Sequence, residues 1–229
     1  MGLFIVREGE GEEDALRSLV VRLRDHLDLV SLPFIARNGN WKKSLVTEAQ
    51  VREACEQIRG SGSCDALLLT RDADNDDLSH ADCPKVSAPE MAAWVRDLLL
   101  PFPVAVVLFY KEYETLFVAG ADAMAGKDVL NPRNAVVSTI PATVVAHTYP
   151  EQPRDAKGWV RMNLLDGYKP ALHQLLLTRL LDFADLEASG LSSYRRLVSA
   201  LTFLSVNLGV AGAVYPSPQA QAPEVVADA

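Results

Sequence analysis

Clustered carboxylates that directly follow an apolar run are the residues of this chain most able to do chemistry. The segment from Asp72 to Asp77 holds four aspartates and comes just after the apolar segment 66–70. A short apolar run that ends in acids is typical of a buried strand at the sheet edge where α/β proteins place their sites. Carboxylate oxygens suit hard divalent cations, and so many like charges would repel each other without one. We therefore expect a Mg²⁺ or Mn²⁺ site with Asp72 and Asp74 as main ligands, Asp76 as a further candidate and Asp77 as a bystander.

Two other predicted strands also end in acids. Glu8 follows the apolar segment 3–6, and Glu112 and Glu114 follow the segment 104–110. Parallel strands of a doubly wound sheet have their carboxyl ends on one edge, so these acids can meet the aspartates in space. Residues two apart in an extended strand point the same way, which predicts that Glu112 and Glu114 share a face. We expect Glu8 and Glu114 to join the metal ligands. Glu112 is expected to contact these ligands and not the metal itself.

The residues around these acids suggest phosphate contacts. A basic residue stands directly before each acidic segment: Arg7, Arg71 and Lys111. These cations could contact phosphate oxygens or simply pair with the acids beside them. Gly9 allows a close backbone approach at a strand-to-helix turn. Glu12 is expected to be an acid in the first turn of a helix. It is also expected to contact the metal ligands and not the metal itself.

Spacing tests whether the aspartate cluster belongs to a different kind of site. A calcium loop of the EF-hand type starting at Asp72 would need glycine at position 77 and glutamate at position 83, where the chain has Asp77 and Cys83. The spacing therefore excludes an EF-hand. An Asp-x-Asp site for a nucleotide sugar with manganese stays open, and so does a turn whose acids only cap and solubilise.

The overall composition limits the class of protein. The chain has 229 residues, with 22 Lys and Arg against 30 Asp and Glu. This acidic balance argues against a broad basic surface for duplex DNA but is compatible with a local basic groove. Three scattered cysteines without CxxC spacing predict a cytoplasmic protein with no structural zinc. No apolar segment reaches the length of a membrane span, and the sequence leaves the oligomeric state open.

Periodicity predicts the elements that must position these acids. We expect a mostly parallel α/β sheet flanked by helices, with a helical C-terminal extension. Strands are expected at 3–6, 30–36, 65–70 and 104–110. Helices are expected at 12–29 and 44–58, and from Ser87 as a cap; Asn38-Gly39-Asn40 indicates a turn.

The second half of the chain is expected to be different in character. Segment 120–154 is rich in Gly, Pro, Asn and Thr and shows no period, which predicts an irregular connection with one short strand. Periodic leucines predict helices at 170–183 and 192–204. The expected organisation is an α/β core at 1–120, an irregular connection at 121–156, a helical part at 157–214 and a disordered tail at 215–229.

Several short motifs, in this order, resemble those of a known family. Glu8-Gly9 with Glu12 resembles the EG-x-x-E opening of a small bacterial Toprim-like family, domain of unknown function 4276. Glu114-Thr115-Leu116-Phe117 resembles its Glu-Ala-Trp-Phe segment, although Thr115-Leu116 stand where Ala-Trp is usual. Lys157 resembles the lysine of its Asp-Pro-Lys, here preceded by Ala156. Tyr168-Lys169 and Ser192-Ser193-Tyr194 resemble its Tyr-x-Lys and Ser-Phe elements.

The resemblance implies a function. In Toprim enzymes, which include topoisomerases, primases and nucleases, the glutamate transfers protons and the aspartates bind magnesium for phosphodiester cleavage. Carried over, Glu8, Asp72 and Asp74 are the catalytic residues, and Lys157 binds phosphate or substrate. The expected protein is a magnesium-dependent nuclease acting on DNA or RNA, in a phage-defence or mobile-element setting. The resemblance also implies an ATPase partner, for which the chain could instead be a non-catalytic regulatory subunit.

Overall fold

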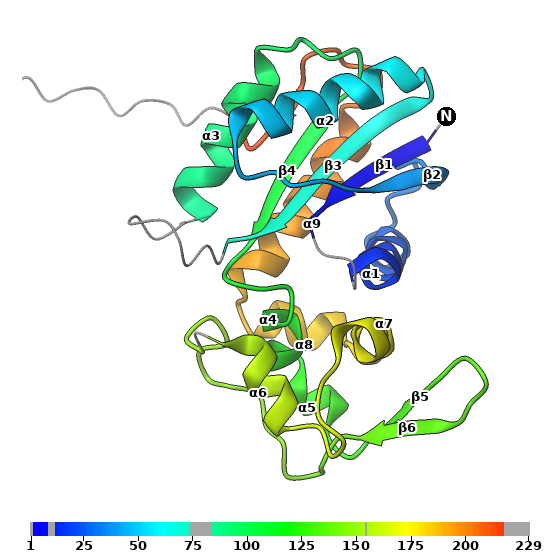
Figure 1. The fold of residues 1–229 in the computed structure, drawn as a ribbon, viewed down its shortest axis with the longest axis vertical. Coiled ribbons are helices and arrows are strands. Elements are labelled where there is room, and N and C mark those ends of the chain that lie inside the picture. Colours follow the sequence, from blue (N-terminus) through cyan, green and yellow to red (C-terminus); the bar gives the residue numbers. More distant parts are fainter. Residues whose placement is uncertain (1, 9–11, 74–83, 154, 218–229) are drawn as a thin grey trace, which may run out of the picture.

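The centre of the molecule is a parallel sheet, seen in Figure 1. The computed structural model describes residues 2–8, 12–73, 84–153 and 155–217. Its five strands are all parallel and lie in the order β2-β1-β3-β4-β7. Their bounds are β1 Gly2–Arg7, β2 Ile35–Lys42, β3 Cys64–Asp72, β4 Val104–Phe109 and β7 Val214–Tyr215. The predicted α/β class with a parallel sheet is confirmed, and the layout is consistent with Rossmann-like and Toprim-like folds.

Helices cover both faces of the sheet, because successive strand residues point to opposite faces and both sets are apolar. Leu3 and Ile5 pack with helices α1 and α9, whereas Phe4 and Val6 pack with α2 and α3. The bounds of these helices are α1 Glu12–His26, α2 Glu48–Ser61, α3 Pro84–Arg96 and α9 Ser192–Val206. Burying apolar side chains on both faces is what holds the central strands in place.

The second strand was predicted in the wrong place. β2 runs from Ile35 to Lys42 and passes straight through the expected turn at 38–40. Gly39 explains the difference, since a Cβ at this position would lie 2.9 Å from the Leu3 carbonyl oxygen. The glycine lets this edge strand approach β1 closely at a register shift and does not mark a turn.

The helix ends follow local capping rules. Thr47 caps α2, and its side chain and that of Gln50 form a capping box. Gly62, in a left-handed conformation, ends the same helix. α3 spans Pro84–Arg96, so Ser87, the predicted cap, lies within this helix.

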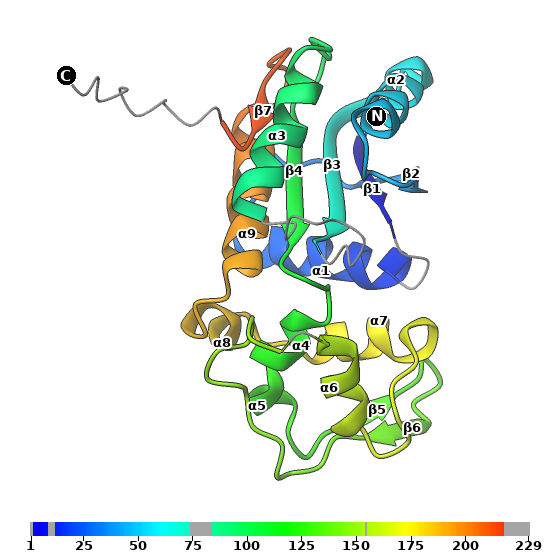
Figure 2. The same ribbon diagram turned by 60° about the vertical axis from the view of Figure 1, so that its left-hand side comes forward.

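A small module lies beyond the carboxyl edge of the sheet. Figures 1 and 2 both show its short helices and its two-stranded hairpin gathered at this end. The elements are α4 Thr115–Ala119, α5 Ala121–Met124, β5 Asp128–Leu130, β6 Val136–Thr139, α6 Ala156–Met162, α7 Pro170–Leu180 and α8 Phe183–Ala188. The segment expected to be irregular therefore holds one short helix and an antiparallel strand pair. We call residues 113–191 the edge module.

After the edge module the chain returns to the sheet. α9 packs on the same face as α1, and β7 adds a short fifth strand beside β4. Of the tail expected to be disordered at 215–229, Tyr215 instead belongs to β7, and residues 218–229 lie outside the described residues. No helix in the described part of the chain is long and apolar enough to cross a bilayer.

Candidate functional site

Three adjacent strands bring acids to one edge of the sheet. Asp72 is the last residue of β3 and lies opposite Phe109, the last residue of β4. β1 pairs with β3 as far as Val6 opposite Leu69, so Glu8 follows β1 at the same edge. Strands paired in this way are about 4.8 Å apart. The topology thus meets the expectation that these strand ends lie together.

The side chain of Lys157 is the cation at the centre of this edge. Its ammonium Nζ lies 2.9 Å from Glu112 Oε1, 3.7 Å from Asp72 Oδ2 and 3.9 Å from Glu114 Oε2. The lysine side chain is 39% exposed, whereas those of Asp72 and Glu112 are 19% and 12% exposed. Residues far apart in the chain therefore form one half-buried cluster of three carboxylates around one ammonium. We call these four residues the Lys157 cluster.

The start of α6 positions the lysine. Asp155 caps this helix, and its Oδ1 accepts a hydrogen bond of 2.6 Å from the Gly158 backbone N–H. The backbone N–H of Lys157 donates to Glu112 Oε2 at 2.9 Å. Glu112 therefore holds both the backbone and the ammonium of Lys157. This double contact fixes the side chain at the sheet edge.

Asp72 is held from the β4 side. Its Oδ1 accepts a hydrogen bond of 2.9 Å from the Tyr113 backbone N–H, while Oδ2 faces Lys157. The ring of Tyr113 lies in a series of edge-on aromatic contacts with Phe109 and Phe117. This packing ties the turn after β4 to the edge module and leaves one carboxylate oxygen of Asp72 toward the cluster.

Glu114 is the buried member of the cluster. Its side chain is fully buried, and Oε1 accepts hydrogen bonds from Tyr168 Oη at 2.8 Å and from Gln174 Nε2 at 3.4 Å. Burial raises the pKa of Glu114, and the charge of Lys157 together with the Tyr168 hydrogen bond offsets part of that rise. This environment makes Glu114 a positioning group for Lys157 and Tyr168.

The extended geometry predicted for Glu112 and Glu114 was wrong. The two residues do not lie in an extended strand: Glu112 precedes a turn, and Glu114 has helical backbone angles before α4. Their carboxylates nevertheless both reach the same ammonium. A turn after β4 and the arrival of α6 from the edge module bring them together.

The cluster sets three carboxylates around one charged ammonium. Burial alone would lower the pKa of Lys157, but Glu114, Asp72 and Glu112 together raise it, so the ammonium stays charged. Burial also raises the pKa of Tyr168, with the adjacent Glu114 charge adding to the effect, so its hydroxyl remains a donor. Three carboxylates surround the single ammonium, and Glu8 adds a further acid at the same edge. In the described residues, the cation that these carboxylates contact is the Lys157 ammonium.

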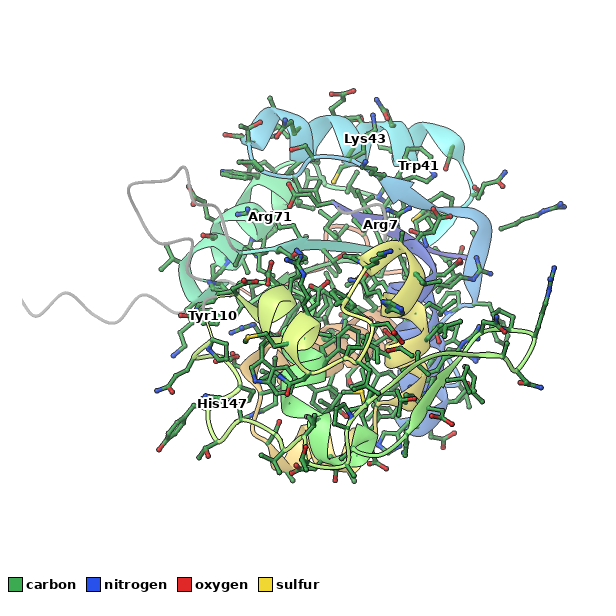
Figure 3. The ribbon with its side chains drawn as sticks, turned by 60° about the horizontal axis from the view of Figure 1, so that its bottom comes forward. Arg7, Trp41, Lys43, Arg71, Tyr110 and His147 are labelled. Carbon is green, nitrogen blue, oxygen red and sulfur yellow. The ribbon has the colours of Figure 1, made fainter. Side chains whose placement is uncertain are left out.

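The predicted basic residues have different surroundings. Arg7 is 3% exposed, and its guanidinium donates to Asn40 Oδ1 and Glu13 Oε2. Arg71 is 4% exposed. Figure 3 shows both residues near the end of the sheet that faces the edge module. Such burial suits support of the strand ends better than direct phosphate contact, which leaves Lys111 and Lys157 as the accessible cations.

Several predicted residues cannot be compared with the geometry. Gly9, Asp74, Asp76 and Asp77 lie outside the described residues, and the side chain of Glu12, the first residue of α1, does too. In the described part of the chain, no group of three or more His, Cys, Asp or Glu side chains could hold a metal ion. The magnesium expectation therefore stays a prediction that depends on Asp74.

The sequence assigned no role to two residues that contact Glu114. It indicated Tyr168 only as part of a motif, and it did not distinguish Gln174. Gln174 lies on the buried side of α7 with 2% exposure. A polar residue at an apolar position of a leucine-rich helix is the signal that could have found it.

Comparisons with known proteins add no identification. No protein-family model matches the chain, and no curated protein or solved structure shows significant similarity to it. A function for this chain must therefore be inferred from the sheet edge and the Lys157 cluster.

Proposed function

We propose that the protein is a magnesium-dependent Toprim-like phosphodiesterase, a nuclease whose active site lies at the carboxyl edge of the sheet. The observation that carries the proposal is the convergence of Lys157 with Asp72 and Glu112 at this edge. The lysine and the acids come from separate elements, and each was selected from the sequence as a site residue. Acids that only cap or solubilise a turn would not need to converge on one lysine.

The proposed residues have distinct roles. Asp72 and Asp74 would hold the Mg²⁺ ion, with Glu8 and Asp76 as further ligands. The bound ion would supply charge stabilisation at the phosphoryl oxygens and help orient the attacking water. Asp72, at the end of β3, is the proposed ligand that lies in the Lys157 cluster.

The chain's own side chains would move the protons and hold the phosphate. Water attacks phosphorus as the bond to the leaving ester oxygen breaks. As a base, Glu8 accepts the water proton and the leaving oxygen takes a proton from solvent; as an acid, Glu8 gives its proton to the leaving oxygen and solvent takes the water proton. The Lys157 ammonium would contact a phosphoryl oxygen. Glu112 and Glu114 keep that ammonium charged and aimed at the edge.

Cleavage assays with matched variants test the proposal. Purified protein with Mg²⁺ or Mn²⁺ should cut single-stranded DNA, duplex DNA or RNA. Asp72→Asn and Glu8→Gln should each lower the rate by about 100-fold or more. Asp65→Asn is the control, because Asp65 lies near the opposite end of the same strand β3. Full activity in Asp72→Asn would overturn the mechanism.

A second function is favoured by one observation. Lys157 already offsets part of the acidic charge, so the edge could be stable as a binding surface without metal. The chain would then be a non-catalytic subunit of an ATPase partner. Calorimetric titration separates the two: heat of Mg²⁺ binding that is lost in Asp72→Asn supports the enzyme. No binding at millimolar Mg²⁺ and no cleavage would favour the subunit.

A further inference from the structure

An open cavity lies at the end of β4. Its volume is about 340 Å³, within the usual range for small-molecule sites. The lining residues come from the end of β4, the loop before α6 and the turn before α9: Tyr110, Thr148, Tyr149, Pro150, Glu151, Gln152, Ser189, Gly190 and Leu191. Tyr110 precedes the cluster residue Glu112 by two residues, so the Cα atoms of these two residues are at most about 7 Å apart.

Hydrogen bonds hold the walls of the cavity in place. The Tyr110 backbone N–H donates to Oγ of the fully buried Ser193 at 2.8 Å. Glu151, another lining residue, accepts hydrogen bonds at Oε1 from the backbone N–H and the hydroxyl of Ser192. Glu151 is thus occupied at the start of α9. The cavity is formed before any ligand binds, which lowers the cost of binding.

The chemistry of the walls suits a flat heterocycle. Two phenol rings line the cavity, that of Tyr110 partly buried and that of Tyr149 63% exposed. The side chain of Gln152 adds an amide donor and acceptor beside them. Aromatic rings stack on nucleobases of any sequence, and amides hydrogen-bond to base edges. Figure 3 shows Tyr110 on the same side of the molecule as His147, which belongs to the loop that continues into the cavity wall.

A cation, Lys111, contacts residues of the cavity wall. Lys111 has a left-handed backbone conformation with φ of 63°, and its ammonium lies 5.4 Å from the centre of the Tyr110 ring. The ammonium donates to the carbonyl oxygens of Gln152 at 3.2 Å and Pro153 at 3.3 Å. An ammonium has three N–H groups, so a third can reach a phosphate oxygen. Along the chain, this cation stands between Tyr110 of the cavity and Glu112 of the Lys157 cluster.

We propose that this cavity binds an unpaired nucleobase whose phosphate is contacted by Lys111. The proposal rests on the proposed phosphodiesterase function, and it adds that the substrate is single-stranded. A base within a duplex is stacked and paired and would have to leave the helix to enter the cavity. The base could belong to a single strand or to a free nucleotide, and competition by free nucleotides separates these sources.

Fluorescence anisotropy tests the cavity without any cleavage. Fluorescein-labelled dT12 and dA12 are titrated with protein in the presence of EDTA, and a 12-base-pair duplex serves as the comparison. The single strands should bind at least tenfold more tightly than the duplex. Tyr149→Ala should weaken binding of the single strands about tenfold, the effect of one lost stacking contact. Gln152→Ala should weaken dT12 and dA12 binding unequally, because the amide contacts base edges.

Phe34→Ala is the matched control. Phe34 is a 68% exposed aromatic residue that directly precedes β2. In the sheet, β2 is separated from β4 by β1 and β3. Its loss should leave the affinity for dT12 unchanged. Tyr149 is largely exposed, so its variant should keep the wild-type melting temperature, and circular dichroism checks this.

The outcomes also separate this proposal from the catalytic one. Unchanged affinity in Tyr149→Ala, no binding of any single strand, or equal binding of the duplex would overturn the base-binding cavity even if cleavage occurs. Loss of binding in Tyr149→Ala would support the cavity even if no nucleic acid is cleaved. Unlabelled TMP or AMP is then added, up to millimolar concentration, to displace labelled dT12. If the free nucleotide binds as tightly as dT12, the cavity is assigned to a free nucleotide. Weaker competition would assign it to a strand.

Discussion

Lys157 joins three carboxylates from separate segments through one ammonium. Its ammonium is within 3.9 Å of three carboxylates, and the lysine is held by the backbone of α6 as well as by its charge. Removing one partner of such a half-buried group leaves uncompensated charge behind. The lysine therefore keeps Asp72, Glu112 and Glu114 together in the folded protein, whatever else binds at this edge.

The buried carboxyl of Glu114 gives the fold a specific pH dependence. Burial raises its folded-state pKa above the unfolded value of about 4.3. Between these two pKa values the folded protein binds a proton that the unfolded chain does not, so stability falls as pH rises through this interval. Glu114→Gln removes this contribution. The free energy of unfolding of the variant, relative to wild type, should therefore rise with pH by up to about 1.4 kcal/mol per unit.

Urea unfolding at stepped pH measures this difference. Glu90→Gln, which changes an exposed side chain on α3, is the control and should follow the wild-type curve. If the Glu114→Gln and wild-type curves stay parallel across the interval, Glu114 does not have a raised pKa.

At the scale of elements, the sequence predicts what periodicity and capping determine and little else. β1, β3 and β4 were found because both of their faces are apolar, and α7 and α9 because their leucines repeat. β2 was misplaced because Gly39 serves a close approach of two strands, which no local pattern distinguishes from a turn. The short elements of 121–156 have too few residues to show a period.

The candidate site could also be predicted only in part from the sequence. The acids at the strand ends could be predicted, because parallel topology alone brings them to one edge. Lys157 was found only through a family resemblance, since its place depends on how α6 packs after the long excursion of the edge module. The contacts of Tyr168 and Gln174 with Glu114 depend on the same packing. Their discovery required the structure.

The first turn of α6 can be tested through Gly158. In a helix, alanine is normally more stable than glycine by about 1 kcal/mol. A Cβ at Gly158, however, would lie 2.1 Å from Oδ2 of the capping residue Asp155. The Asp155 side chain would have to swing away, and losing the cap costs about 1 kcal/mol. We expect Gly158→Ala to bring no gain in the free energy of unfolding.

A double-mutant cycle separates the cap from the glycine. In an Asp155→Ala background the collision is absent, so Gly158→Ala should then stabilise the protein by about 1 kcal/mol. Urea unfolding of the four proteins gives the coupling. Additive effects would mean that Asp155 does not cap α6 in solution.

At the scale of the whole molecule, the sheet and the edge module enclose the proposed site between them. Figures 1 and 2 show the edge module beyond the end of the sheet at which β3 and β4 finish. The sheet supplies Asp72, the turn after β4 supplies Lys111 and Glu112, and α6 supplies Lys157. The site is thus built from both parts, and its two accessible cations, Lys111 and Lys157, are set in an otherwise acidic protein of net charge −8.

This charge distribution predicts a weak dependence of nucleic-acid binding on salt. Each phosphate neutralised on a single strand contributes about 0.7 to the slope of log K against log salt. Contacts from Lys111 and Lys157 alone give a slope between about −1 and −2 for dT12. Lys111→Met should make the slope shallower by about 0.7, whereas Lys127→Met, at an exposed lysine beside β5, should leave it unchanged. Anisotropy titrations in EDTA between 50 and 300 mM salt, roughly the range in which such slopes are linear, supply the measurement. A slope steeper than about −4 would show that many more phosphates are bound than these two lysines can contact, and the nucleic acid would then lie on another face of the molecule.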